Sequence, residues 1–241
     1  MTAVASDTLD PGLHCLRAGY TQRVPPEYFV DADDDGVTWQ PDVYPLVLDL
    51  AREHGRTAVI DLGCGRAGKL AALGEQDPGL ELVGVDYGPN IAWCRENLPR
   101  GRWVEADLET AAALPISPGT AARSVVVCSD VLEHLVDPRP AMRLICRLLD
   151  QGAACAVVST PARDLRAGTA HPGPPRNPSH VREWAQDEFR AFLGGFPVAV
   201  ERAGLTRSDD RDGGLTTQLV VLGPAAPGAA AGARGTEARA R

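Results

Sequence analysis

Thr57-Ala-Val-Ile-Asp61-Leu-Gly63-Cys-Gly65-Arg-Ala-Gly68 is the stretch of this chain that decides its fold. An apolar run ends in an acid and breaks into glycines before a helical pattern begins. Glycine has no Cβ, so the backbone can approach a ligand closely there and adopt positive φ. The free N–H groups at the start of the following helix face the same crevice. The stretch therefore predicts a strand, a ligand-binding turn and a helix.

Outward from this stretch, short β-branched runs alternate with helical patterns, which is typical of an α/β fold with a parallel sheet covered on both faces. Turn-forming residues at 208–214 predict that the last two strands form an antiparallel hairpin. The expected strands are 57–62, 80–85, 102–106, 123–129, 153–159, 197–204 and 215–222. The expected helices are 42–54, 67–74, 90–98, 131–149 and 185–194.

The glycine spacing, Gly63-x-Gly65-x-x-Gly68, also fits a dinucleotide fingerprint, as in a dehydrogenase. A carboxylate at Asp61 would repel a pyrophosphate and favour a cation. S-adenosylmethionine is cationic and carries no phosphate. At these residues the chain resembles the class I methyltransferases that use S-adenosylmethionine, whose first motif is a strand followed by Asp/Glu-x-Gly-x-Gly-x-Gly. Ala67 stands where the third glycine is usual.

Acids follow three further strands, at Asp86, Asp107 and Asp130. In a doubly wound sheet, ligands bind at the carboxyl ends of the strands, where Asp86 could accept both ribose hydroxyls. Alternatively, Asp86 is a helix N-cap before Pro89, and any of these acids could be an ordinary turn residue. The resemblance implies a cofactor site formed by Asp61, Gly63, Cys64, Gly65, Asp86, Tyr87, Asp107, Leu108, Ser129 and Asp130.

The same resemblance assigns roles along residues 55–222. Tyr87 would cover the adenine, although an exposed turn tyrosine is the alternative. Asp107 would hold the adenine amino group. The run from Val125 to Pro138 resembles the family's fourth motif, whose strand-end residues would face the methionine part and the methyl group. The resemblance also implies a Rossmann-like three-layer sandwich whose seven-stranded, mostly parallel sheet has one antiparallel strand.

Two histidines are candidate general bases. Methyl transfer is an in-line displacement that needs orientation more than a nucleophilic side chain, and a base helps only for a hydroxyl or a protonated amine. His134 lies at helical spacing from Asp130, which favours a packing role over catalysis. His180 follows the Pro/Gly-rich loop 161–178, where similar enzymes place the acceptor; a hydrogen bond at the helix entry is its alternative.

An aromatic N-terminal segment is the candidate lid, because aromatic side chains could exclude water and attract a sulfonium. The alternative is a hydrophobic staple for a loose terminus. The predicted lid and substrate residues are Tyr20, Arg23, Tyr28, Phe29, Trp39, Glu183 and Trp184. The acidic run at 31–35 lacks the distal glutamate of a calcium loop, so we expect a solvated loop and no metal site.

Composition limits the partners. Among 241 residues, 32 are acidic and 24 are basic, and the net charge of −8 disfavours binding to a phosphate backbone. The six cysteines have no metal spacing, and several lie in apolar runs. The first seven residues lack a basic start and an apolar core, and no window could span a membrane, so we expect a soluble, cytoplasmic protein. A homodimer is compatible with this sequence.

These observations predict one folded unit with three regions. Residues 1–55 would form a helical lid segment, 56–223 the S-adenosylmethionine-binding domain, and 224–241 a disordered tail of Ala, Gly, Arg and Pro. The expected function is transfer of a methyl group to an O or N atom of a small molecule, as in specialised metabolism. A protein or RNA methyltransferase and a non-catalytic cofactor-binding domain are the alternatives.

Overall fold

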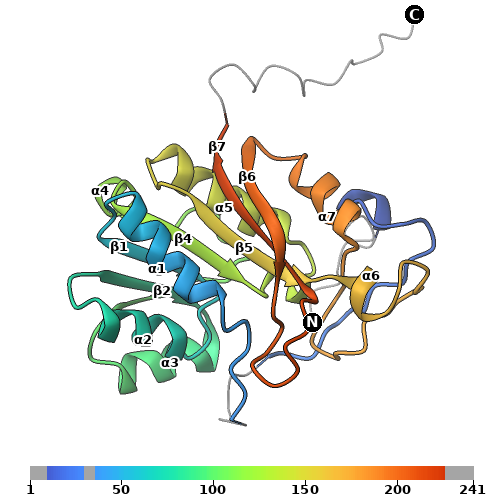
Figure 1. The fold of residues 1–241 in the computed structure, drawn as a ribbon, viewed down its shortest axis with the longest axis horizontal. Helices are drawn as coiled ribbons and strands as arrows, with labels where there is room; N and C mark the ends of the chain where they lie inside the picture. Colours follow the sequence, from blue (N-terminus) through green and yellow to red (C-terminus); the bar gives the residue numbers. More distant parts are fainter. Residues whose placement is uncertain (1–9, 30–35, 226–241) are drawn as a thin grey trace, which may run out of the picture.

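The computed structural model describes residues 10–29 and 36–225. The terminal residues 1–9, the acidic loop and most of the tail predicted above therefore lie outside the described residues. The centre is a seven-stranded sheet in the order β3-β2-β1-β4-β5-β7-β6 (Figure 1). Its strands are β1 (Ala58–Leu62), β2 (Glu81–Asp86), β3 (Arg102–Glu105), β4 (Ser124–Ser129), β5 (Ala156–Pro161), β6 (Val198–Thr206) and β7 (Thr217–Pro224).

All seven predicted strands are present, and one of them, β7, is antiparallel to its neighbours. Strands β1 to β5 pair in parallel, whereas β7 inserts between β5 and β6 and runs antiparallel to both. The connection from β6 to β7 covers only residues 207–216, too short for a crossover to a parallel strand. The sheet therefore confirms the mostly parallel α/β fold.

Helices cover both faces of the sheet, which gives the three predicted layers (Figure 1). On one face, α1 (Val43–Glu53), α2 (Gly68–Gln76) and α3 (Gly88–Asn97) pack against Val59, Val125 and Val157. On the other, α5 (Arg139–Asp150) and α7 (Gln186–Leu193) pack against Ile60 and Val126. Successive strand residues point to opposite faces, so each strand contributes to both cores.

The helix predicted at 131–149 is wrong in its first part. Only a short 3₁₀ helix, η3 (Leu132–His134), follows β4, and the α-helix begins later, at Arg139. Pro138 and Pro140 explain the break, because proline starts a helix readily but cannot continue one. Among the described residues, the short helices η2 (Pro11–His14), α4 (Pro118–Ala121) and α6 (Arg163–Arg166) were not predicted.

The N-terminal segment 10–29 runs along the loop that follows β5. Backbone hydrogen bonds join Thr21 N–H to the Pro172 carbonyl (2.7 Å) and Arg23 N–H to the Val181 carbonyl (2.8 Å). Helix α1, by contrast, belongs to one of the two main cores. A boundary at residue 55 therefore separates elements that share one core. No helix in the described part of the chain is long and apolar enough to cross a membrane.

Candidate functional site

The glycine turn after β1 has the backbone that the sequence predicts. Gly63 has a φ of +79° and Gly65 a φ of +56°. The N–H of Gly63 donates to the Val85 carbonyl (2.8 Å), which ties the turn to β2. A Cβ on Gly63 would lie 2.5 Å from a methyl carbon of Val131. The absence of a side chain at Gly63 therefore lets the turn pack against the end of β4.

Asp61 lies beneath this turn and is 1% exposed. It points to the face covered by α1, where the Tyr44 hydroxyl donates a hydrogen bond of 2.7 Å to its Oδ2. Its Oδ1 is buried and has no hydrogen-bond partner among the described residues. Burial raises the pKa of Asp61 to about 7. The site thus holds a carboxylate oxygen that a cationic ligand could bind.

Asp86 closes the crevice from the end of β2. Its Oδ2 accepts a hydrogen bond from the Gly65 N–H (2.7 Å), and its Oδ1 accepts one from the Tyr87 N–H (2.7 Å). These donors fix the orientation of the carboxylate at the carboxyl end of β2. The next residue, Tyr87, is 42% exposed, so its ring is accessible to a ligand.

Asp130 follows β4 with a φ of +51°, in the left-handed region that non-glycine residues rarely adopt. The Ser159 hydroxyl donates to its Oδ1 (2.7 Å), and the Gln40 side-chain amide donates to its Oδ2. The Ser129 and Ser159 hydroxyls are also hydrogen-bonded (2.9 Å). This network holds the Asp130 carboxylate at the same edge of the sheet as Asp61 and Asp86.

Three other predicted cofactor residues have different surroundings. Asp107 is engaged in its own turn, where its two carboxylate oxygens accept from the Glu109 N–H (2.9 Å) and the Thr110 hydroxyl (3.1 Å). Leu108 packs in the hydrophobic core. Cys64 is buried, and its thiol lies 3.6 Å from the Gly65 carbonyl oxygen. Asp107 therefore has the geometry of an ordinary turn residue, which was the alternative to a role in cofactor binding.

His134 and His180 lie side by side, with ring centroids 4.7 Å apart. The Nδ1 of His134 is 3.0 Å from the Ser179 carbonyl, and the Nδ1 of His180 is 2.8 Å from a Glu183 oxygen. The Nε2 of His180 is 3.0 Å from the Asn177 side-chain amide. Burial, and then the neighbouring His180, lower the pKa of His134 to about 3. His134 is therefore neutral, and both nitrogens of His180 contact side chains of its own loop.

Comparisons with known proteins agree with this geometry. A model of the methyltransferase domain matches residues 60–157, which include the glycine turn and the ends of β2 and β4. An uncharacterised methyltransferase of Mycobacterium tuberculosis (strain H37Rv) is 30% identical over 136 residues, which cover 55% of this chain and 66% of the relative. Together these matches support a class I S-adenosylmethionine-dependent methyltransferase. The cofactor of this family is S-adenosylmethionine.

Other members of the family match over smaller shares or with lower identity. A trans-aconitate 2-methyltransferase of Azoarcus sp. (strain BH72) is 31% identical over 101 residues, which cover 41% of this chain and 37% of the relative. The methyltransferase domain of the bacterial protein CtHen1-C has a TM-score of 0.54 at 22% identity, over 76% of this chain and 97% of that domain. Mitomycin 7-O-methyltransferase has a TM-score of 0.52 at 18% identity, over 76% of this chain and 54% of that one. The structural matches show the shared fold, and the chain spans just under two thirds of the mycobacterial relative.

Two of the predicted lid and substrate residues are core residues instead. Trp184 is fully buried, stacks on Phe192 and donates its indole N–H to the His14 carbonyl (2.8 Å). Tyr20 is 3% exposed, and its hydroxyl accepts from the Glu183 N–H (3.1 Å). Buried side chains of this kind fasten the N-terminal segment to the fold, as the staple alternative supposes.

The end of the same segment contacts residues that follow β2 and β4. The Tyr28 hydroxyl donates to the Tyr87 carbonyl (2.9 Å), and the Phe29 ring lies 5.5 Å from the His134 ring. Tyr28 and Phe29 are 42% and 51% exposed. Together they span the distance from the end of β2 to the residues after β4. Arg23 donates to the Pro175 carbonyl (2.6 Å) and so braces the segment against the loop.

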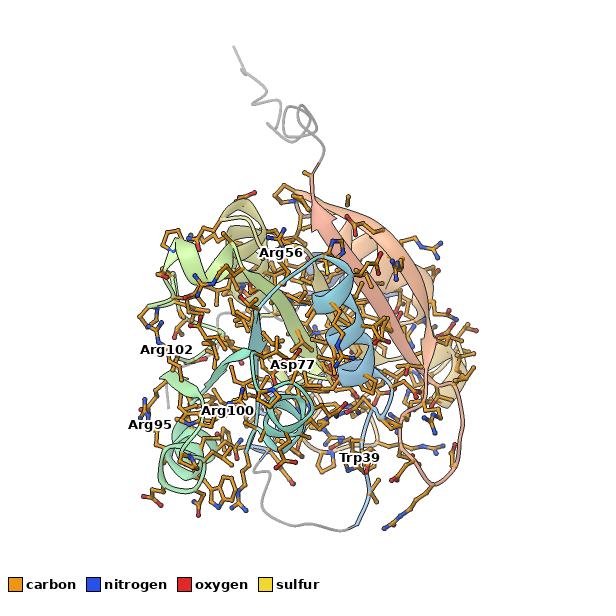
Figure 2. All side chains as sticks on the ribbon, turned by 60° about the vertical axis from the view of Figure 1, so that its left-hand side comes forward. Trp39, Arg56, Asp77, Arg95, Arg100 and Arg102 are labelled. Carbon is orange, nitrogen blue, oxygen red and sulfur yellow. The ribbon has the colours of Figure 1, made fainter. Side chains whose placement is uncertain are left out.

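Trp39 lies farther away, beside the hairpin of β6 and β7 (Figure 2). It forms an isolated antiparallel bridge with Asp209, and its carbonyl accepts from Lys69 Nζ (3.3 Å). Its ring is 47% exposed. Trp39 thus connects the chain before α1 to that hairpin and to α2.

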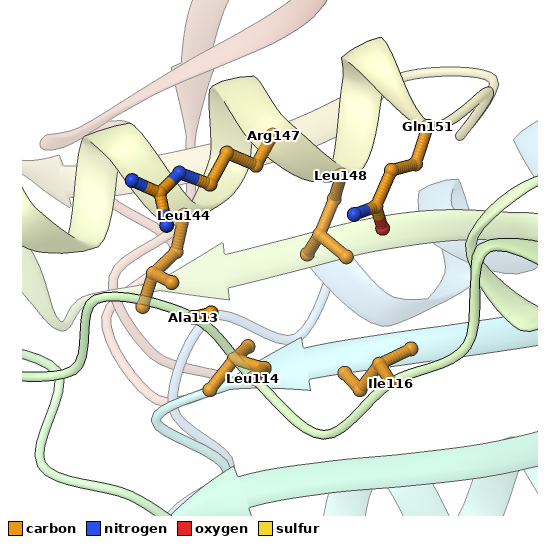
Figure 3. Close-up of a pocket in the computed structure, with 7 residues that line it drawn as sticks. All are labelled: Ala113, Leu114, Ile116, Leu144, Arg147, Leu148 and Gln151. Carbon is orange, nitrogen blue, oxygen red and sulfur yellow. The ribbon is translucent and has the colours of Figure 1, made fainter.

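A small cavity lies away from this crevice. It measures about 40 Å³ and lies between α5 and the loop before α4 (Figure 3). A hollow of about 210 Å³ adjoins it and is lined in part by Glu109, Arg143 and Arg147. Neither includes the aspartates at the carboxyl ends of the strands, so neither is the cofactor site.

Sequence reasoning missed several residues of the site. Tyr44 lies in α1 and contacts Asp61. Gln40 lies just before α1 and contacts Asp130. Ser159 holds Asp130 from the end of β5. Glu133 is fully buried beside both histidines. A signal existed only for Glu133, as a charged residue within the apolar fourth motif.

Proposed function

We propose that this protein transfers the methyl group of S-adenosylmethionine to an oxygen or nitrogen atom of a small-molecule acceptor, as in specialised metabolism. The observation that carries the proposal is the buried Asp61, whose Oδ1 has no hydrogen-bond partner among the described residues. A buried carboxylate without a compensating partner is costly, so the site fits a ligand that brings positive charge.

The residues around the glycine turn would hold the cofactor. When bound, S-adenosylmethionine supplies an electrophilic methyl group. Gly63 leaves room for close approach, Asp61 attracts the cationic amino-acid part, and Asp86 accepts the ribose hydroxyls. Tyr87 stacks on one face of the adenine. Orientation and exclusion of water are then the main tasks of the protein.

The acceptor would enter where Tyr28 and Phe29 span the crevice. The contact of Phe29 with His134 supports an acceptor side near η3 and the loop after β5. The named activities of a trans-aconitate 2-methyltransferase and a mitomycin 7-O-methyltransferase support an acceptor of small size. His180 would support the acceptor loop through Glu183 and Asn177 rather than meet substrate as a free base.

An RNA acceptor is the competing hypothesis, since the similar structures include a small RNA methyltransferase. The arginines near β3 give it little support (Figure 2). Arg95 pairs with Glu105 (2.7 Å), and Arg102 donates to the Pro115 carbonyl. Arg100 donates to carbonyls at both ends of the loop before β2. The net charge of −8 also opposes association with a polyanion.

The test is calorimetry with S-adenosylmethionine and its demethylated product, followed by a labelled-methyl assay over hydroxylated and aminated small molecules and over RNA. Asp61→Asn and Asp86→Ala should each weaken cofactor binding by about 1–3 kcal/mol, because each removes a charged hydrogen-bond partner. Asp77→Asn is the control, since Asp77 lies at the far end of α2 and accepts from the Gly79 N–H.

The outcomes separate the alternatives. Wild-type protein that binds neither cofactor form would refute the proposal. Binding without transfer to any acceptor would identify a cofactor-binding domain instead of an enzyme, and transfer to RNA alone would refute a small-molecule acceptor. Equal affinities for the Asp61→Asn, Asp86→Ala and Asp77→Asn variants would remove both aspartates from the site.

A further inference from the structure

Glu133, His134 and His180 form a cluster that the cofactor site does not use. Each can offer one ligand atom, and these atoms all lie within 4.8 Å of one another. Glu133 and His134 come from η3, whereas His180 comes from the loop after β5. The hydrogen bond from the Val181 N–H to the Glu133 carbonyl (2.7 Å) holds the two segments together.

Glu133 supplies the observation that points to a ligand. It is fully buried, and the Thr160 hydroxyl donates to its Oε2 (2.9 Å). Its Oε1 is buried and has no hydrogen-bond partner among residues 10–29 and 36–225. A buried carboxylate oxygen without a hydrogen-bond partner is costly, and a cation beside Oε1 would compensate it.

The two imidazoles are arranged as metal ligands usually are. The Nδ1–H of His134 donates to the Ser179 carbonyl, and the Nδ1–H of His180 donates to Glu183. Such donation fixes the tautomer and leaves Nε2 with its lone pair for a metal. The Nε2 of His180 accepts from the amide of Asn177, an exposed side chain that can exchange this contact for water.

We propose that Glu133, His134 and His180 bind one divalent transition-metal ion. Two histidines and one carboxylate form a donor set that suits such ions and leaves coordination positions open. Tetrahedral ligands about 2.1 Å from one ion lie about 3.4 Å apart, so the ligand atoms must move closer by up to about 1.4 Å when the ion binds. His134 is only half-buried, which provides a route of entry.

The position of the ion suggests its role, and this step rests on the proposed function. The cluster adjoins Asp130 and the ring of Phe29, where the proposed function expects the acceptor. An ion with open positions could bind an acceptor oxygen and favour its deprotonated form. The inference therefore favours an acceptor that presents an oxygen, and it assigns Glu183 as a positioning residue for His180.

The test is titration of tag-free protein with Co²⁺, followed by calorimetry and by visible absorption of the bound ion. Wild-type protein should bind one equivalent. Glu183→Gln, which removes the hydrogen-bond partner of His180, should lower the affinity for Co²⁺ by about 10–100-fold. Glu133→Gln and His180→Asn each remove a ligand and should lower that affinity at least as much. His54→Gln is the matched control, because His54 is exposed at the end of α1.

Calorimetry with S-adenosylmethionine on the same samples shows whether each variant is folded. Retained cofactor binding with lost Co²⁺ binding in the cluster variants supports the proposal. Absence of Co²⁺ binding by wild-type protein, or equal affinities for wild-type, Glu133→Gln and His180→Asn, would overturn it. A protein that binds S-adenosylmethionine but no Co²⁺ refutes the metal site alone, whereas one that binds Co²⁺ but no cofactor refutes the proposed function.

Discussion

Positive φ values mark the residues that shape the cofactor crevice. Gly63 and Gly65 adopt them without cost, but Ala67 has a φ of +56° and Asp130 a φ of +51°. The left-handed conformation costs a residue with a Cβ about 1–2 kcal/mol. Ala67 nevertheless forms the turn before α2 and is 1% exposed, so its methyl group packs in the core. The missing third glycine is thus compatible with the turn.

Gly63→Ala should lower both stability and cofactor affinity. The new Cβ would meet the buried Val131 at 2.5 Å and would sit at a φ of +79°. Gly55→Ala is the matched control, because Gly55 has a φ of +60° and nothing within 4 Å of a Cβ. Urea unfolding should show a loss of about 1–2 kcal/mol for Gly55→Ala and a larger loss for Gly63→Ala. Equal losses would show that Val131 does not crowd the turn.

At the scale of elements, a buried ion pair joins three segments around the acceptor loop. Arg163 of α6 donates to Glu188 of α7 (2.8 Å), and both side chains are buried. Glu188 also accepts from the backbone N–H groups of Arg17 (2.8 Å) and Ala185 (2.9 Å). Glu188 thereby connects the N-terminal segment to the helix that follows the loop.

Glu188→Ala should destabilise the protein by about 3–5 kcal/mol, because it leaves the Arg163 charge buried without its partner. The control is Glu53→Ala, which breaks the exposed pair of Glu53 and Arg202 (3.1 Å) and should cost at most about 1 kcal/mol. Free energies of unfolding from urea titrations measure both. A cost for Glu188→Ala no greater than that for Glu53→Ala would contradict a structural role for the buried pair.

At the scale of the whole molecule, the stability should depend on pH through His14. His14 is fully buried beneath α7 and faces Arg182, Asp137, Arg139 and Gln22. Burial, and then the charge of Arg182, lower its pKa from 6.5 to about 4. Between these values the unfolded chain binds a proton that the folded chain refuses. Above pH 6.5 protonation of His14 therefore costs the folded protein no stability. As the pH drops from 6.5 toward 4, the free energy of unfolding falls.

Replacement of this group should flatten that dependence. Between pH 6.5 and pH 4, protonation of His14 should lower the free energy of unfolding of the wild-type protein by roughly 3 kcal/mol. The His14→Phe variant should lack this loss. His54→Gln serves as the control with an exposed histidine. The measurement is the difference in free energy of unfolding between each variant and wild-type at pH 6.5 and pH 4.5. A difference for His14→Phe that does not change with pH would contradict the predicted linkage.

The sequence by itself determined the layers, the strands and the glycine turn. Alternating β-branched runs and helical patterns are local signals. Their apolar residues must be buried regardless of which element packs against them. The acids Asp61, Asp86 and Asp130 follow from the same logic, because parallel strands end at one edge of the sheet. The helix predicted at 131–149 failed where prolines interrupt an otherwise apolar period.

Only the tertiary structure decided which side chains meet. Tyr44 reaches Asp61, Trp184 enters the core, and Glu133 comes beside His180. These contacts join residues from different elements, often far apart along the chain. Hydropathy and spacing describe each element alone, whereas a contact depends on how the elements pack. The sequence therefore predicted the fold and the sheet edge at which Asp61, Asp86 and Asp130 gather, whereas the packing of the elements decided which groups each charged side chain contacts.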